Sequence, residues 1–143
     1  MSLTIHYTAH ATASGGRNGH TENADKVVSV DLSIPKAMGG AGTPGTTTPE
    51  DLFAAGYAAC FGSACEFISK QLKLAPSHIQ IDAAVGIGSR SEGGFGLKTD
   101  LTATITGLSQ ADAEKLVHAA HQVCPYSNAT RNNMEVGLTI KVL

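Results

Sequence analysis

Several residue types are scarce in this chain, and each scarcity narrows the class of protein. Tryptophan is absent, aromatic residues make up 5% of the 143 residues, and arginine occurs only at Arg17, Arg90 and Arg131. The formal net charge is −2 and the ten Lys and Arg residues are scattered, whereas nucleic-acid binding needs clustered positive charge. These features argue against nucleic acid as a partner. The length predicts a single domain, residues 1–143, with a buried core.

The sequence also shows neither a targeting segment nor a long uncharged run. Residues 1–7 have no basic start and no apolar stretch of the kind that marks a signal peptide. The longest central run without charge, Leu52 to Cys65, is shorter than the roughly 20 residues that span a bilayer. We therefore expect a cytosolic protein. Structural disulfides are rare in the cytosol, so the three cysteines are either buried filler or take part in reactive, transient chemistry.

Hydrophobic patterning predicts five strands and two helices in the order strand, strand, helix, strand, strand, helix, strand. The predicted strands are Leu3–Ala9, Lys26–Ile34, Ile79–Gly88, Gly96–Gly107 and Val136–Val142. The stretch from Pro35 to Thr48 is rich in Gly, Thr and Pro and predicts a loop. This order indicates an α+β domain with mainly antiparallel pairing.

Both predicted helices begin with recognisable capping residues. Thr48 suits an N-cap and Pro49 the first helical position, so we expect a helix from there to about Leu72, before Pro76. Ser109 and Asp112 open a second helix that ends near Val123. The first half of the longer helix, Leu52–Gly62, is apolar on every side and predicts a buried helix. A sheet this small covers such a helix poorly, so we expect an intertwined homodimer.

Cys60 lies in the middle of the longer helix, where nothing nearby in the sequence activates a thiol. Only a thiolate is a nucleophile, and a thiol with a pKa of about 8.5 is roughly 3% ionised at pH 7. Cys60 lies about 16 Å along the axis from Pro49, beyond the reach of the helix dipole. Burial would raise its pKa further. A reactive Cys60 therefore needs a cation from elsewhere, and Arg17, flanked by glycines, is the best candidate.

The other two cysteines have different settings. Cys124 lies at a helix end before Pro125, where a thiol has room to move, although a small gap-filling residue is equally common there. Cys65 lies roughly 140° around the helix from Cys60, and we expect an inert core thiol. His118, His121 and Cys124 are spaced three apart, but no second cluster completes a tetrahedral zinc site.

Three segments together resemble the organic hydroperoxide resistance branch of the OsmC/Ohr family. They are Tyr7-Thr-Ala-His-Ala-Thr-Ala-Ser-Gly-Gly-Arg17, Thr48-Pro-Glu-Asp-Leu-Phe-Ala-Ala-Gly-Tyr-Ala-Ala-Cys60-Phe and Val123-Cys-Pro-Tyr-Ser-Asn-Ala-Thr-Arg-Asn-Asn133. The resemblance covers essentially the whole chain. It implies an OsmC/Ohr-like α+β fold in which two buried central helices are wrapped by mainly antiparallel sheets built from both chains of a homodimer.

The resemblance also implies a function and roles for four residues. Members of this branch reduce organic hydroperoxides to alcohols. By motif, Cys60 would be the peroxidatic cysteine, Cys124 the resolving cysteine, Arg17 the residue that holds the thiolate, and Glu50 the residue that orients Arg17. The implied reductant is a dithiol of the lipoyl type, dihydrolipoamide or a lipoylated protein, with no bound metal, haem or flavin. The motif assigns Cys65 no role.

Three alternatives remain open from the sequence. The first is a peroxidase of the osmotically inducible type that shares the cysteine pair and uses another reductant. The second is a thiol redox sensor that does not turn over. The third is a non-catalytic dimer that binds apolar ligands, for which Cys60→Ser would leave function intact.

Overall fold

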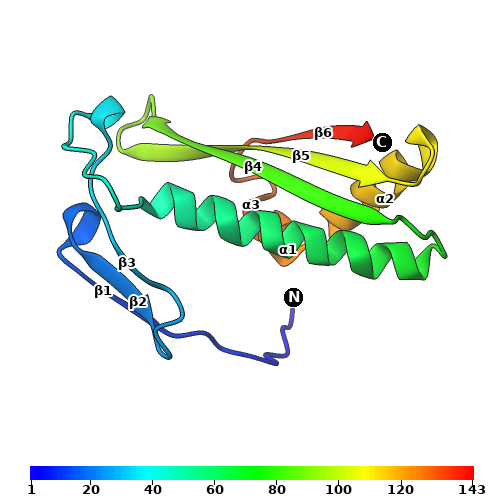
Figure 1. Ribbon diagram of the computed structural model, residues 1–143, viewed down its shortest axis with the longest axis horizontal. Helices are drawn as coiled ribbons and strands as arrows, with labels where there is room; N and C mark the ends of the chain where they lie inside the picture. The colour runs from blue at the N-terminus through cyan, green and yellow to red at the C-terminus, as the bar shows by residue number, and fades with distance from the viewer. The chain divides into compact units, whose positions relative to one another are not determined.

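A computed structural model describes all 143 residues and divides them into two compact units, Met1–Leu52 and Phe53–Leu143. The fold is α+β, with two three-stranded sheets in the orders β1-β2-β3 and β4-β5-β6 (Figure 1). Three of the four strand pairings are antiparallel, as expected, and only β5 with β6 is parallel. That the whole chain forms one domain stays a prediction.

The first unit contains a small antiparallel sheet whose position along the chain was predicted wrongly. Its strands are β1 (Ala11–Ser14), β2 (His20–Asn23) and β3 (Ser29–Asp31), with short 3-10 turns at Gly16–Asn18 and Lys36–Met38. Residues 3–9 alternate in polarity but form no strand here, because a strand also needs a neighbour with which to pair. The predicted strand over 26–34 shrinks to β3, since Lys26 adopts a left-handed turn conformation with φ 63°.

The long helix α1 (Pro49–Gln71) confirms the predicted bounds. The Thr48 hydroxyl accepts a hydrogen bond from the Asp51 amide at 3.1 Å, as an N-cap does. By length and composition α1 could cross a membrane, with a mean hydropathy of 1.3 over 18 residues. A core helix passes the same test, and one side of α1 carries the buried residues Tyr57, Phe61, Ala64, Cys65 and Ile68.

The second unit is built on the sheet β4 (His78–Ser89), β5 (Phe95–Thr106) and β6 (Val136–Val142). The bounds of β4 and β5 lie within one residue of the prediction, and those of β6 match it. From Thr99 to Ile105, every second residue of β5 is buried and the residues between them are exposed or half-buried. The sheet therefore has one buried face. Two helices connect β5 to β6, and such a crossover brings the second strand back parallel to the first.

Those two helices are α2 (Gln110–Val123) and α3 (Pro125–Thr130). Ser109 caps α2 by accepting a hydrogen bond from the Asp112 amide at 3.1 Å, as predicted. Cys124 ends α2 and is also the N-cap of α3. The prediction treated Pro125 only as the end of a helix and missed α3, although proline equally suits the first position of a new one.

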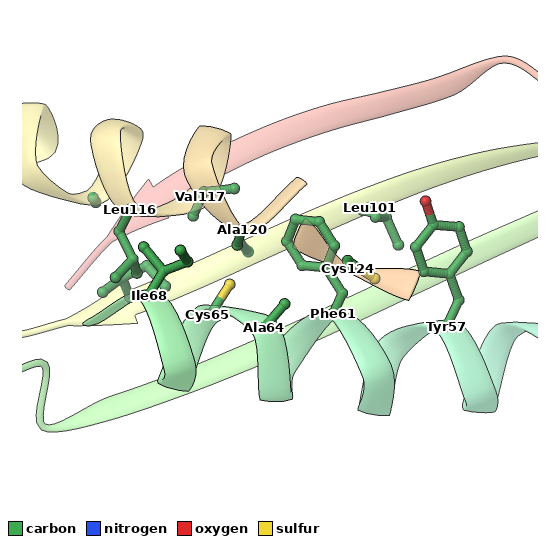
Figure 2. Close-up of a cluster of buried hydrophobic side chains, with 13 residues drawn as sticks. Tyr57, Phe61, Ala64, Cys65, Ile68, Leu101, Leu116, Val117, Ala120 and Cys124 are labelled. Atoms are coloured by element: carbon green, nitrogen blue, oxygen red, sulfur yellow. The ribbon is translucent and has the colours of Figure 1, made fainter. Parts of the chain in front are cut away.

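The core of this unit lies between α1, α2 and the buried face of the sheet. Figure 2 shows Phe61, Ala64, Cys65 and Ile68 projecting from α1 toward α2. The partners from the other elements are Leu101, Ala103, Ile105, Ala113, Leu116, Val117, Ala120 and Cys124, each at most 1% exposed. No element of the second unit covers the opposite side of α1: Ala55, Ala59 and Glu66 are exposed, and Phe67 is 55% exposed. The expected partner subunit stays a prediction.

We predict that Phe61→Ala lowers the free energy of unfolding by about 3–5 kcal/mol, because it empties a fully buried site between three elements. Urea denaturation measures this change. Phe95→Ala is the matched control, since Phe95 is 72% exposed and its loss should cost less than about 1 kcal/mol. Equal effects of the two substitutions would contradict this account of the core.

Candidate functional site

The second unit brings two of the three cysteines together. Sγ of Cys60, on α1, lies 3.8 Å from Sγ of Cys124, at the junction of α2 and α3, and both thiols are free. A disulfide has an S–S length of about 2.05 Å, so the sulfurs need approach by less than about 2 Å to bond. Sixty-four residues separate the two positions in the sequence. The pair is therefore close enough to form a disulfide on oxidation and to return to two thiols on reduction.

The environment of Cys60 opposes ionisation in one respect and favours it in another. Burial is the largest effect and raises the pKa of the Cys60 thiol, and the neighbouring Cys124 raises it further. The backbone N–H of Tyr126 hydrogen-bonds the sulfur and lowers that pKa. Sequence reasoning looked for a cationic side chain and missed this backbone donor. The Cys-Pro pair offered the signal, because a helix that starts at Pro125 leaves its next N–H groups without helical partners.

Cys124 and Cys65 are both fully buried. The position of Cys124 at a helix end is confirmed, although its side chain has no exposed surface. Burial raises the pKa of the Cys65 thiol to about 12, with smaller contributions from Cys124 and Glu66. Cys65 is therefore held as a neutral thiol at physiological pH, which agrees with the inert core role expected for it.

The first unit joins Arg17 to Glu50. The guanidinium donates two hydrogen bonds to the carboxylate, at 2.8 Å and 2.6 Å, in a bidentate ion pair. The hydrogen bond from Arg17 lowers the pKa of Glu50, and the same bond raises the pKa of Arg17. Arg17 lies in a 3-10 turn that follows Gly15, whose φ of 79° suits glycine. The glycine-flanked loop therefore carries the arginine to the carboxylate at the start of α1.

The second unit also contains a buried polar group that sequence reasoning did not select. The Tyr57 hydroxyl lies 2.8 Å from Oγ of Ser127, which in turn lies 2.8 Å from Nδ1 of His121. Burial lowers the pKa of His121, and the nearby Arg131 and His118 lower it further, so its surroundings favour the neutral ring. The aromatic ring of Tyr126 packs against Tyr57 and Phe53, with centroids 5.6 Å and 6.0 Å apart. In the sequence, His121 stood out only for its zinc-like spacing from His118 and Cys124, and Ser127 only as part of the third motif.

The four predicted site residues thus form two pairs. Arg17 bonds Glu50 in one unit, and Cys60 faces Cys124 in the other. A thiol pair with a backbone donor at one sulfur can undergo reversible oxidation to a disulfide. No group of three or more His, Cys, Asp or Glu side chains is arranged to hold a metal ion. The chemistry that these residues offer is the nucleophilic and redox chemistry of sulfur.

Comparison with known proteins relates the chain to one family. A family model described as OsmC-like protein matches residues 40–139. The organic hydroperoxide resistance protein of Xanthomonas axonopodis pv. citri is 52% identical over 135 residues, which is 94% of either chain. The protein OhrB of Bacillus subtilis, also described as an organic hydroperoxide resistance protein, is 41% identical over 140 residues, or 94% of this chain and 98% of its own.

Solved structures agree with the sequence comparisons. An organic hydroperoxide resistance protein from Elizabethkingia anophelis superposes with a TM-score of 0.93 at 46% identity, over 99% of this chain and 100% of its own. The structure of OhrB of Bacillus subtilis gives a TM-score of 0.86 at 43% identity, over 94% and 98%. These matches confirm the OsmC/Ohr-like fold class predicted from the three motifs. The chain belongs to the OsmC-like family, in the branch of the organic hydroperoxide resistance proteins.

Proposed function

We propose that this protein is a cysteine-based peroxidase that reduces organic hydroperoxides to alcohols. The observation that carries the proposal is the approach of the Cys60 and Cys124 sulfurs to 3.8 Å. The names of the relatives support the class of substrate, because they are organic hydroperoxide resistance proteins. Cys60 is the peroxidatic residue and Cys124 the resolving one. The partial exposure of Cys60 and the complete burial of Cys124 support this assignment.

The proposed cycle has three steps that balance. The Cys60 thiolate attacks the peroxide oxygen remote from the alkyl group, the O–O bond breaks, and the alkoxide takes up a proton and leaves as the alcohol. Cys60 is now a sulfenic acid. The Cys124 sulfur attacks it, the S–O bond breaks, and the hydroxyl leaves as water with the thiol proton. An external dithiol then reduces the disulfide by exchange and is itself oxidised.

Activation of Cys60 requires more than ionisation. Complete ionisation of a thiol that is about 3% thiolate raises the rate at most about thirty-fold. A thiolate of lower pKa is also a poorer nucleophile, with a slope near 0.4–0.5 in disulfide exchange, which cancels much of that gain. Arg17 therefore has a second role in our proposal. Its guanidinium donates to the peroxide oxygens as charge develops on the leaving alkoxide.

The course of α1 bears on which arginine serves which cysteine. Helix α1 begins at Pro49 and continues unbroken past Cys60, so Glu50 is already helical. Ten residues of helix correspond to about 15 Å of rise between Glu50 and Cys60. A helix that began after Glu50 would have shortened this separation, but α1 includes Glu50. We therefore propose a homodimer in which Arg17 and Glu50 of one subunit serve Cys60 of the other, with the side of α1 that carries Phe67 within the interface.

The remaining features of the proposal concern the reductant and the setting. We propose a dithiol of the lipoyl type as reductant, free as dihydrolipoamide or attached to a protein, and no bound cofactor. A cytosolic location suits a cycle in which the disulfide is continuously reduced. Reductant preference separates this proposal from an osmotically inducible type of peroxidase. Turnover separates it from a redox sensor.

We predict sustained reduction of an alkyl hydroperoxide when dihydrolipoamide is the reductant. Cys60→Ser should abolish turnover and peroxide consumption, because the nucleophile is gone. Cys124→Ser should still consume about one equivalent of peroxide per Cys60 but lose the disulfide step. Peroxide consumption and dithiol oxidation measure these outcomes, with Cys65→Ser as the control that retains activity. Activity that survives Cys60→Ser would contradict the proposal.

We predict that Arg17→Lys slows the reaction with peroxide at least about tenfold beyond what the change in Cys60 pKa explains. Lysine keeps the charge but lacks the fork of donors that can hold two oxygens. Thiolate absorbance titrates Cys60, and stopped-flow oxidation with excess hydroperoxide gives the rate. If the rate falls only as far as the thiolate fraction falls, Arg17 acts through ionisation alone.

We predict that a dimer of one Cys60→Ser subunit and one Arg17→Ala subunit keeps about half of the wild-type activity. In a shared site, the intact cysteine of one chain meets the intact arginine of the other. The matched control pairs a Cys60→Ser, Arg17→Ala double variant with a wild-type subunit, which leaves no complete shared site. Activity in the control dimer and none in the first dimer would show that each site is built within one chain.

A further inference from the structure

A series of hydrogen bonds, buried at Tyr57 and Ser127 and half-buried at His121, connects the three elements that carry the two facing thiols. Tyr57 extends from α1, His121 from the last turn of α2, and Ser127 from α3. Oγ of Ser127 lies 2.8 Å from the Tyr57 hydroxyl and 2.8 Å from Nδ1 of His121. Tyr57 and Ser127 are fully buried. Figure 2 shows the Tyr57 ring directed away from α1, on the same side of the helix as Phe61.

Each residue of this hydrogen-bond network lies three positions from one of the two cysteines in the sequence. Tyr57 precedes Cys60 by three residues, so both lie on adjacent positions of one helical turn. His121 precedes Cys124 by three residues and Ser127 follows it by three. The hydrogen-bonded atoms are therefore attached to the same short backbone segments as the two sulfurs. A displacement of α3 relative to α1 would break the 2.8 Å contacts and change the S–S separation together.

Ser127 is the residue that links the two sides of this network. Its hydroxyl contacts both Tyr57 and His121, while Thr130 lies 3.3 Å from the Tyr57 hydroxyl and bonds the Ser127 carbonyl. Arg131 donates to the main-chain carbonyl of His121 and so closes the end of α2. No buried polar side-chain atom lacks a partner. A network that is complete in this way holds one arrangement, because any shift leaves a buried polar group unpaired.

The segment around Cys124 needs such a restraint relative to α1. Cys124 is extended between two helices, with φ −60° and ψ 124°. Its N–H donates to the Ala120 carbonyl and its own carbonyl accepts from the Asn128 amide, each at 2.9 Å, but both bonds stay within α2 and α3 and do not fix these helices relative to α1. Its surroundings in the core are apolar, and apolar packing is much less directional than a hydrogen bond. Closure of the disulfide requires the Cys124 sulfur to lie in line with the S–O bond of oxidised Cys60. An error of about 1 Å in such an alignment can slow a reaction about a hundredfold.

We propose that Tyr57, Ser127 and His121 are positioning residues that aim the Cys124 sulfur at Cys60 for disulfide formation. The inference rests on the proposed roles of the two cysteines. The step is the condensation of Cys60 sulfenic acid with the Cys124 thiol, in which the S–S bond forms, the S–O bond breaks and water leaves. None of the three side chains exchanges a proton or electron in it. Loss of the network should slow this step and leave the attack on peroxide unchanged.

The test compares Ser127→Ala with Ser69→Ala. Ser69 is also buried, but its hydroxyl bonds only the Glu66 carbonyl, at 2.7 Å, within α1. Each protein is reduced, mixed with one equivalent of an alkyl hydroperoxide, and quenched over time for intact mass. We expect Ser127→Ala to form sulfenic acid at a rate within twofold of wild type and to form the disulfide about tenfold more slowly. Its Cys60 should then accumulate sulfinic acid at excess peroxide.

Two further variants separate positioning from general stability. Tyr57→Phe removes one hydroxyl while keeping the ring, and should slow disulfide formation as Ser127→Ala does. His121→Asn keeps a polar atom near the place of Nδ1 and should restore most of the rate that His121→Leu loses. If disulfide formation stays within twofold of wild type in Ser127→Ala and Tyr57→Phe, the network is only structural. The proposal is also overturned if Ser69→Ala slows the step equally, or if Asn and Leu at position 121 behave alike.

Diamide oxidation distinguishes failure of this inference from failure of the proposed function. Diamide takes up two electrons and two protons from a dithiol, so it closes the disulfide without any peroxide chemistry. We expect diamide to close Cys60–Cys124 about tenfold more slowly in Ser127→Ala than in wild type. If wild type fails to reduce hydroperoxides but diamide still closes its disulfide about tenfold faster than that of Ser127→Ala, the proposed function is wrong and the positioning role is supported. If wild type reduces hydroperoxides with turnover and diamide forms the disulfide equally fast in wild type and Ser127→Ala, the positioning role is wrong.

Discussion

The packing of α1 against α2 and the buried face of the β4–β5–β6 sheet underlies the other features of the second unit. Tyr57, Phe61 and Ile68 project from one side of α1 into this core, together with the buried thiol Cys65. The same packing places Cys60 beside the junction of α2 and α3, where its sulfur lies 3.8 Å from the sulfur of Cys124. Burial that stabilises the fold thus also brings the dithiol together and raises the pKa of both α1 thiols.

Burial disfavours the thiolate form of Cys60, so the groups around its sulfur must stabilise that form. A desolvated Cys60 ionises less readily than a free thiol, so each polar group near it matters more than it would in water. The Tyr126 amide at the start of α3 supplies one hydrogen bond, and in our proposal Arg17, oriented by Glu50, supplies the charge. Cys65, which has no such donor among the effects on its pKa, is held neutral. The two cysteines differ in how readily they ionise because their neighbouring groups differ.

The errors in the predicted fold have a common physical origin. Alternation of polar and apolar residues located β4, β5 and β6, whose side chains face a core within the chain. The same rule failed for residues 3–9, which alternate but have no strand beside them here, and for β2, which is too short and polar to show a pattern. α3 was missed because proline marks both the end of one helix and the beginning of another.

The sequence by itself determined the helix starts at Thr48 and Ser109, the α+β class and the family, since capping residues, periodicity and motifs are local properties of the chain. Only the tertiary structure decided that Cys60 faces Cys124, that a backbone amide reaches the Cys60 sulfur, and that Tyr57, Ser127 and His121 form one network. These contacts join residues up to 70 positions apart. Such proximity follows from how the whole core packs, and no local pattern encodes it.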